Sequence, residues 1–379
     1  MSEYQYYEFL AIDRPLTAAE MRVLRSYSTR AVITPTSFTN HYNWGDFKGN
    51  PDKWVEKYFD AFLYLANWGT HILKLRFPSE LLSLETAREY CQTDFVSAWE
   101  KDGKLIVSFE SQDEDGDWEE DGVGLLSSMV SVRSEIIDGD LRALYLGWLL
   151  DAQNEELEED DLEPPVPPNL KELSPSLESL ANFLRIDAHL LAAAASASPT
   201  VEKPKEDNKA FDKWIATLDA REKDAMLASL MRGEADYLGR ELLTRFQRET
   251  HPASSGVSAA DAAPRRTVSQ LLAGADEFRR IAEKHKAEAK ARRERAAAEA
   301  RNRYLDDLAG RTPQTWAEIE SLIATKLPKN YDEAMKLLKD LKDLADRQGS
   351  SDFQLRIAAL RAAHARKSAL MDRLRKLGL

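Results

Sequence analysis

The side chains best suited to chemistry lie in a short stretch with one glycine, residues 39–47, which holds His41 and Asp46. Histidine titrates near neutral pH, so an imidazole that a carboxylate orients can act as a general base. His71, beyond the next predicted helix, is a second candidate for this role. Asn, Gly and aromatic side chains also build turns whose polar groups bond to the backbone, and this structural interpretation of the stretch is the preferred one.

Binding of a partner is a further interpretation of the same stretch. Its Asn40 and Trp44 are the contact residues that we then expect, together with Trp68, which precedes His71 in the chain. A structural turn and a binding loop therefore both remain open for this stretch.

An acidic run, residues 113–121, has alternating carboxylates that suggest calcium; they belong to Asp113, Asp115 and Asp117. It departs from the EF-hand loop, because Gly116 stands at loop position four and Trp118 occupies the position of the required glycine. Gly124 also replaces the terminal glutamate. A solvated loop is the preferred interpretation, and the sequence predicts neither a metal nor another cofactor, since GxxxxGK, GxSxG, HExxH and paired-cysteine motifs are all missing.

The single cysteine, Cys91, has no partner for an intramolecular disulfide, and its helical surroundings favour a buried thiol over a nucleophile. The chain begins without a basic, apolar signal sequence, so we expect a cytoplasmic protein. No window approaches about 18 uncharged apolar residues, and no membrane span is predicted.

Ten basic residues lie between positions 279 and 303 and could follow the phosphates of a nucleic acid. Aromatic residues for base stacking are limited to Phe278 and Tyr304 nearby, and four glutamates interrupt the charge. A solvated spacer helix is the preferred interpretation of this stretch, ahead of a protein-docking face and of nucleic-acid binding.

The length and the charge distribution of the chain indicate which folded units position these residues. A chain of 379 residues is too long for one ordinary core, so two or three folded units are expected. Residues 1–165 hold 14 basic and 33 acidic residues, whereas residues 251–379 hold 26 basic and 18 acidic ones. Such a chain could pair its own ends, associate head to tail, or offer its basic end to an anionic partner.

Strand and helix patterns alternate over the first 150 residues. Thr17 and Glu20 have the spacing of a capping box before a helix that ends near Tyr27, and a second helix is predicted to run from Pro51 to Phe62. Strands are expected at 4–11, 34–42, 69–77, 96–99 and 104–109, the last two as a hairpin. The predicted fold class is an α+β N-terminal domain with a small mixed sheet, then an all-α half with one long charged helix and a small helical bundle.

Linkers are predicted wherever proline, serine or acidic residues accumulate. The expected organisation is an acidic α+β domain (1–153), an acidic Pro-rich linker (154–169), short helical segments (170–250) with an internal linker (196–208), a linker (251–264), a long charged helix (265–310) and a basic helical bundle (311–379).

Several sequence blocks resemble a bacterial family of uncharacterised proteins. They are YYEFLAIDRPLT, ITPTSFTNHYNWGDFKGNP and FDAFLYLANWGTH near the N-terminus, and WAEIESLIATKLPKNYDEAMKLLKDLKDLA and HARKSALMDRL near the C-terminus. The resemblance covers most of the chain outside the linkers and implies no activity or catalytic residue. It implies a multi-component system, with a co-encoded SWIM zinc-finger protein as the partner to consider.

The function predicted from the sequence is a non-enzymatic interaction or scaffold protein, whose N-terminal domain binds a partner protein. One alternative is a nucleic-acid-associated protein that uses the basic helix 279–303. The other alternative is an enzyme of unknown reaction with a site around His41, Asp46 and His71. A stable dimer of the long helix would indicate a coiled coil instead of a spacer.

Overall fold

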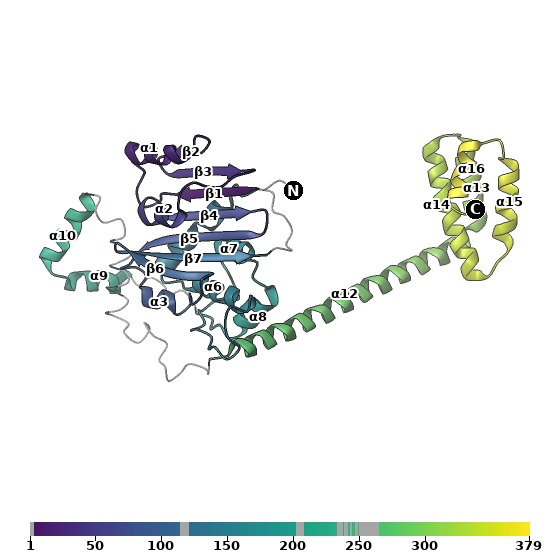
Figure 1. Cartoon of the computed structure of the whole chain (residues 1–379). Coiled ribbons are helices and arrows are strands. Elements are labelled where there is room, and N and C mark those ends of the chain that lie inside the picture. The colour runs from purple at the N-terminus through teal and green to yellow at the C-terminus, as the bar shows by residue number, and fades with distance from the viewer. Residues whose placement is uncertain are drawn as a thin grey trace. The chain divides into compact units, whose positions relative to one another are not determined.

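A computed structural model describes residues 4–113, 121–201, 208–232 and 265–379, with single residues at 238, 242, 245, 246 and 249 (Figure 1). It divides into two compact units, Met1–Arg280 and Ile281–Leu379. Asp115 and Asp117 lie outside the described residues, as do the predicted linker 251–264 and residues 202–207 of the predicted linker 196–208.

The first unit contains a seven-stranded sheet with the order β2-β3-β1-β4-β5-β7-β6. The predicted α+β class is confirmed, but every strand pair is antiparallel and the sheet is not mixed. Tight turns join β2 to β3, β4 to β5 and β6 to β7, and tight turns connect antiparallel strands. The strands are β1 (Gln5–Leu10), β2 (Val32–Thr34), β3 (Ser37–Tyr42), β4 (Ala61–Ala66), β5 (Thr70–Pro78), β6 (Val96–Lys101) and β7 (Lys104–Gln112).

The β6–β7 hairpin follows the sequence prediction. Its two turn residues, Asp102 and Gly103, both have positive φ angles, 51° and 69°. Two consecutive positive φ angles define a type I′ turn, whose twist matches that of the strands that it connects.

The central strand β4 differs from the prediction, which extended a helix to Phe62. Helix α2 (Pro51–Lys57) ends earlier, and the buried Asp60 comes directly before β4. Both faces of β4 are covered, so its run of apolar residues has no polar alternation. A strand buried on both sides cannot be distinguished from a buried helix by periodicity alone.

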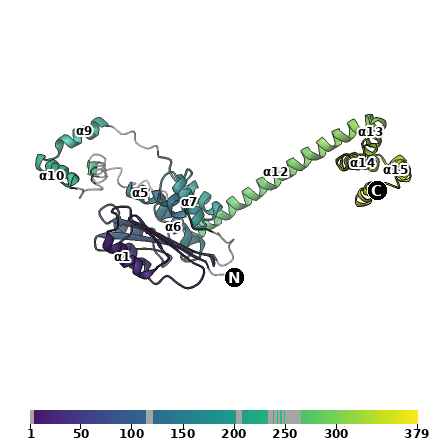
Figure 2. The same ribbon diagram turned by 90° about the horizontal axis from the view of Figure 1, so that it is seen from above.

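Helices cover both faces of the sheet (Figure 2). One face, with Leu63 and Leu73, forms a core with α4 (Leu125–Met129), α5 (Ser131–Ile137), α6 (Arg142–Gln153), α7 (Pro175–Phe183) and α8 (Ala188–Ser196). The opposite face, with Phe9 and Phe62, packs against α1 (Ala18–Tyr27) and α2. The capping box predicted for α1 is present: the Thr17 side chain accepts from the backbone N–H of Glu20, whose carboxylate accepts from the backbone N–H of Thr17.

Helix α6 is buried along nearly its whole length and lies directly on the sheet. A Cβ atom on Gly147 would come within 2.7 Å of the Phe109 ring and 2.8 Å of Val96. Glycine therefore allows α6 to approach β6 and β7 closely. The short helix α3 (Leu84–Arg88) contributes Ala87 to the same core.

Residues 154–169 were expected to form an exposed linker. Most side chains from 154 to 162 are exposed, but residues 163–167 pack against the first unit. Glu163 is buried, and its backbone N–H donates to the carbonyl oxygen of Arg266 at 2.8 Å. Leu162 and Thr267 form a β-bridge, and the Tyr90 hydroxyl donates to the carbonyl oxygen of Pro165 at 2.9 Å. The proline-containing part of this segment is therefore held against the core. A proline-rich composition alone does not distinguish such a packed segment from a solvated tether.

Two further helices, α9 (Asn208–Thr217) and α10 (Ala220–Met231), lie within the predicted short helical segments (170–250). Trp214 on α9 is buried, whereas Leu227 and Met231 on α10 are exposed.

Helix α12 (Val268–Gly310) contains 43 residues and agrees with the predicted long charged helix (265–310). Its first turns belong to the core of the first unit through Leu271 and Ala275, and its last turns belong to the core of the second unit through Leu305 and Leu308. Every side chain from 281 to 300 is exposed. No described helix is both long enough and apolar enough to cross a membrane.

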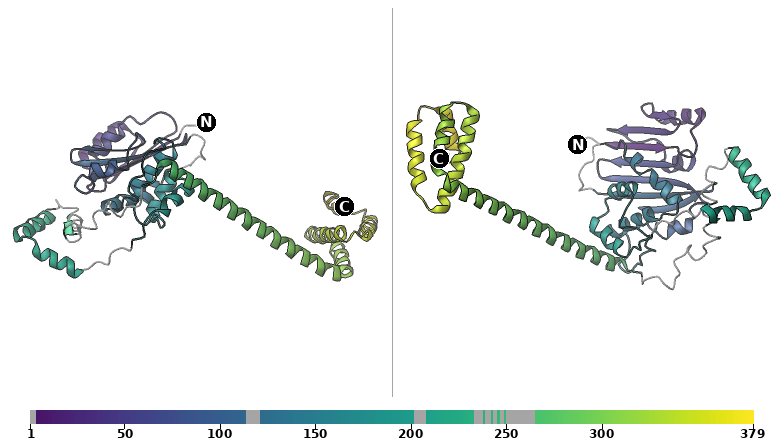
Figure 3. Two further views of the ribbon diagram at one scale, coloured as in Figure 1. Left: turned by 90° about the horizontal axis from the view of Figure 1, so that it is seen from below. Right: turned by 180° about the vertical axis from the view of Figure 1, so that it is seen from behind.

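The second unit is a helical bundle with its own core (Figure 3). Its helices are α13 (Thr312–Ala324), α14 (Pro328–Gln348), α15 (Asp352–Ala363) and α16 (Ser368–Lys376). These helices form the predicted helical bundle (311–379), and the helical path between α15 and α16 is interrupted between His364 and Lys367. This break allows Leu370 and Leu374 of α16 to enter the core that α13 and α14 form.

Candidate functional site

The stretch 39–47 comprises the end of β3 and the turn that follows, which a buried glutamine of β1 holds in place. The Nε2 group of Gln5 donates to the carbonyl oxygen of Gly45 at 3.0 Å and to Oδ1 of Asp46 at 3.2 Å. Asp46 therefore fixes the turn to the sheet. No hydrogen bond between Asp46 and His41 is present among the described residues.

An aromatic cluster packs beneath this turn. The Phe47 ring stacks on Tyr7 with 5.0 Å between centroids and meets Trp54 edge-on at 4.7 Å. The hydroxyls of Tyr7 and Tyr64 donate to Oε1 of Gln5 at 2.7 and 3.1 Å. Burial raises the pKa of Tyr7 to about 12, so its hydroxyl remains a hydrogen-bond donor at neutral pH. These contacts attach the turn to the core through Phe47.

The three predicted partner-binding residues lie in different surroundings. Asn40 is buried, and its Nδ2 group donates to Ser28 Oγ at 2.9 Å and to a neighbouring tyrosine hydroxyl at 2.8 Å. Trp44 is 69% exposed, with the Arg30 guanidinium 5.2 Å from its ring centroid. Trp68, in the β4–β5 turn, is 43% exposed. Only the two tryptophans are thus accessible to a partner.

His71 is buried and has a partner on each ring nitrogen. Its Nδ1 lies 2.8 Å from the carbonyl oxygen of Phe183, and its Nε2 lies 2.9 Å from a terminal nitrogen of Arg185. A guanidinium can only donate, so Nε2 accepts and Nδ1 donates, which defines a neutral imidazole. The ring also stacks on Phe183 with 4.7 Å between centroids. His71 therefore connects β5 to the chain around the end of α7.

The structure does not bring His41 and His71 together. Across the sheet, His41 is paired with Tyr6, Tyr6 with Leu65, and Leu65 with His71. Three strand spacings of about 4.8 Å separate the two histidines by about 14 Å, too far for shared proton transfer. His41 is exposed on β3, whereas His71 is buried on β5.

Of the predicted thiol and metal candidates, the structure describes Cys91 and Asp113. Cys91 is buried, and burial raises the pKa of its thiol far above neutral, so the nucleophilic thiolate does not form. The backbone N–H of Asp113 donates to the carbonyl oxygen of Gly69 at 3.2 Å. Within the part of the chain that the structure describes, no three metal-ligating side chains converge.

The basic stretch of α12 is partly neutralised by carboxylates. Lys290 lies 4.0 Å from Glu294, and Arg301 contacts Asp340 at 2.7 Å and Asp343 at 2.5 Å on α14. The last turns of the helix thus use their charge to pack against α14. A nucleic acid would have to compete with these carboxylates.

A buried ion network, which includes Asp60 just before β4 and Arg76 on β5, was not predicted from the sequence. Asp60 accepts from Nε and a terminal nitrogen of Arg76 at 3.1 and 2.7 Å, and from the backbone N–H groups of Ile12 and Asp13 at 2.7 and 2.9 Å. Arg133 donates to the Arg76 carbonyl oxygen at 2.6 Å and to Oδ2 of Asp13 at 2.8 Å. Burial opposes ionisation of Asp60, but Arg76, the Asp13 N–H and Arg133 together keep its pKa below the usual value. The negative charges of the two carboxylates equal the positive charges of the two guanidinium groups, which is typical of a structural cluster.

A second buried cluster attaches the start of α12 to the first unit. The carboxylate of Glu163 accepts from the Tyr145 hydroxyl and from Nε and a terminal nitrogen of Arg266 at 2.8 and 2.7 Å. Arg266 also donates to the carbonyl oxygen of Ala193 at 2.8 Å. This cluster joins α6, α8 and residues 154–169 just before α12 begins.

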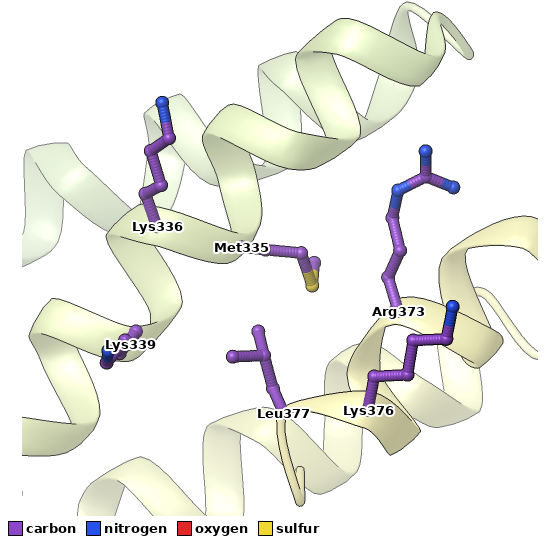
Figure 4. A pocket seen from close by; sticks show the side chains of 6 residues that line it. All are labelled: Met335, Lys336, Lys339, Arg373, Lys376 and Leu377. Carbon is purple, nitrogen blue, oxygen red and sulfur yellow. The ribbon is translucent and has the colours of Figure 1, made fainter. Parts of the chain in front are cut away.

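The second unit has a surface hollow of about 250 Å³ between α14 and α16 (Figure 4). Its apolar side chains are Met335 and Leu377, and four cationic side chains surround them: Lys336, Lys339, Arg373 and Lys376. The sequence analysis did not identify this site. A signal was available, because each helix places two basic residues three positions apart on an amphipathic pattern.

In comparisons with protein-family models, with curated proteins and with solved structures, nothing matches this chain. The fold therefore defines only a class: an antiparallel α+β unit followed by a helical unit that has its own core.

Proposed function

We propose that the chain is a non-enzymatic interaction or scaffold protein that binds one partner protein through each of its units. One observation carries the proposal: the side chains of residues 281–300 are all exposed, although the helix that contains them begins in one core and ends in the other. Exposed side chains contribute no burial energy to either core. A helix of this kind is suited to linking two binding units.

The arrangement of the candidate catalytic residues supports the same proposal. His41 and His71 are separated by two strands, Asp46 bonds to an amide, and both nitrogens of His71 are engaged. A general base needs an orienting partner and access to its substrate. None of these three residues has both. We further propose a cytoplasmic location, since Cys91 is a free buried thiol.

Affinity capture by the full chain from cells of its native source tests the proposal. Trp44→Ala removes a side chain that is 69% exposed and should abolish capture of a specific protein without changing the thermal unfolding of the first unit. Val123→Ala is the matched control, because Val123 is also 69% exposed. The proposal fails if both variants capture the same proteins as the parent, or if a reaction of the chain disappears in His41→Ala.

A further inference from the structure

We infer that the hollow between α14 and α16 binds an acidic peptide segment of a partner protein, with one bulky apolar side chain inserted between the helices. The inference rests on the proposed interaction function and adds the chemistry of one partner. Two features of the hollow support it: an apolar floor, formed by Met335 and Leu377, and a cationic rim, formed by Lys336, Lys339, Arg373 and Lys376.

The floor fits a single large apolar group. Met335 is buried and Leu377 is half-buried, and both line the hollow (Figure 4). A cavity of roughly 150 Å³ accommodates benzene, and this hollow measures about 250 Å³. An aromatic side chain therefore fits, and the flexible thioether of methionine can adjust to it.

The rim fits carboxylates on both sides of that group. Lys336 pairs with Glu333 at 3.1 Å and Arg373 with Asp332 at 2.7 Å, but both carboxylates are exposed. Exposed ion pairs contribute little and exchange readily. Among the described residues, no carboxylate forms an ion pair with Lys339 or Lys376.

Charge alone would also suit a nucleic acid, but the floor favours a peptide. Proteins that hold single strands stack the bases on aromatic side chains along a basic groove. The residues that line this hollow include no aromatic side chain. Its cations surround a short aliphatic floor, which matches one side chain flanked by acidic residues.

Fluorescence anisotropy of the full chain with a labelled peptide tests the inference. The probe has four glutamates on each side of one tryptophan, and the reference peptide has alanine in place of the tryptophan. We expect the tryptophan peptide to bind about tenfold more tightly than the alanine peptide. Equal affinities would show that charge alone attracts the peptide and would overturn the inference.

Charge reversal locates the site. Lys339→Glu/Lys376→Glu should weaken binding of the tryptophan peptide by about tenfold, and circular dichroism should show unchanged helicity because both side chains are exposed. Arg361→Glu/Arg366→Glu, which makes the same charge change at exposed positions outside the hollow, is the control and should bind normally. Equal losses in the two variants overturn the inference.

A nonathymidylate, which carries the same eight negative charges as the peptide, provides the last comparison. Tighter binding of this oligonucleotide than of the tryptophan peptide would contradict a peptide site. A chain that captures a partner through Trp44 but does not bind the peptide likewise overturns the inference, while the proposed function stands.

Discussion

Replacing Asp151 by Asn should stabilise the first unit, and the effect should grow as the pH rises. Asp151 lies on α6 with no exposed surface, and neither carboxyl oxygen has a partner within standard hydrogen-bond geometry in the described part of the chain, although the nearby Thr93 hydroxyl favours its charged form. Burial raises the pKa of Asp151 to about 7, and the negative charge of Glu156 acts in the same direction. The buried carboxyl of Asp151 therefore becomes charged only as the pH rises through about 7.

The magnitude follows from the two titration positions. An aspartate in an unfolded chain titrates near pH 3.9, whereas the folded carboxyl titrates near pH 7. This difference corresponds to roughly 4 kcal/mol. Because the folded pKa is the higher one, the full stability is present below about pH 4 and is lost as the pH rises through about 7. The free energies of unfolding of Asp151→Asn and of the parent should therefore diverge by roughly 4 kcal/mol between pH 4 and pH 8.

Native-state hydrogen exchange of the full chain is the appropriate assay, because it reports the opening of α6 separately from that of the second unit. Peptides from α14 serve as an internal reference, and Asp160→Asn makes the same change at an exposed carboxyl. With rates corrected for the intrinsic pH dependence, α6 should be better protected in Asp151→Asn than in the parent by roughly 4 kcal/mol at pH 8 and by roughly 1.5 kcal/mol at pH 5. Equal protection at both pH values would refute the reasoning.

Three further predictions concern stability and the long helix. Asp60→Ala should lower the free energy of unfolding of the first unit by about 3–5 kcal/mol, because two buried guanidinium groups lose a shared carboxylate; urea unfolding followed by tryptophan fluorescence measures the loss. Arg266→Ala should make residues 154–169 accessible to a protease that leaves them intact in the parent, because Glu163 loses its paired charge; unchanged protection would contradict this. A peptide of residues 285–303 should be partly helical and monomeric by circular dichroism and sedimentation, since alanine buries little surface; a salt-resistant dimer would indicate a coiled coil.

Much of the fold was predictable where local chemistry determines the structure. The Thr17 capping box, the Asp102–Gly103 turn and the length of α12 all depend on neighbouring residues, and all three predictions agree with the structure. The β4 strand was missed because both of its faces are buried, which removes the alternation that identifies a strand. The packing of residues 154–169 depends on Arg266, about a hundred residues away, which composition does not reveal.

The sites were less predictable for the same reason. The Asp60 network joins residues up to 120 positions apart in the chain, and only the sheet brings them together. His71 was a candidate general base in the sequence. Its two hydrogen-bond partners come from the end of α7 and the residues after it, more than a hundred positions away. The hollow between α14 and α16 requires the break after α15, which returns the last helix to α14.

The central claim is that one chain holds two partner proteins at once. The most direct measurement is size-exclusion chromatography with light scattering of the full chain, mixed with the protein captured through Trp44 and the protein captured through the hollow between α14 and α16. We predict a complex that contains the chain and both partners, from which Trp44→Ala removes one partner and Lys339→Glu/Lys376→Glu removes the other. Mutually exclusive binding of the two partners, or loss of both partners in each variant, would contradict the account.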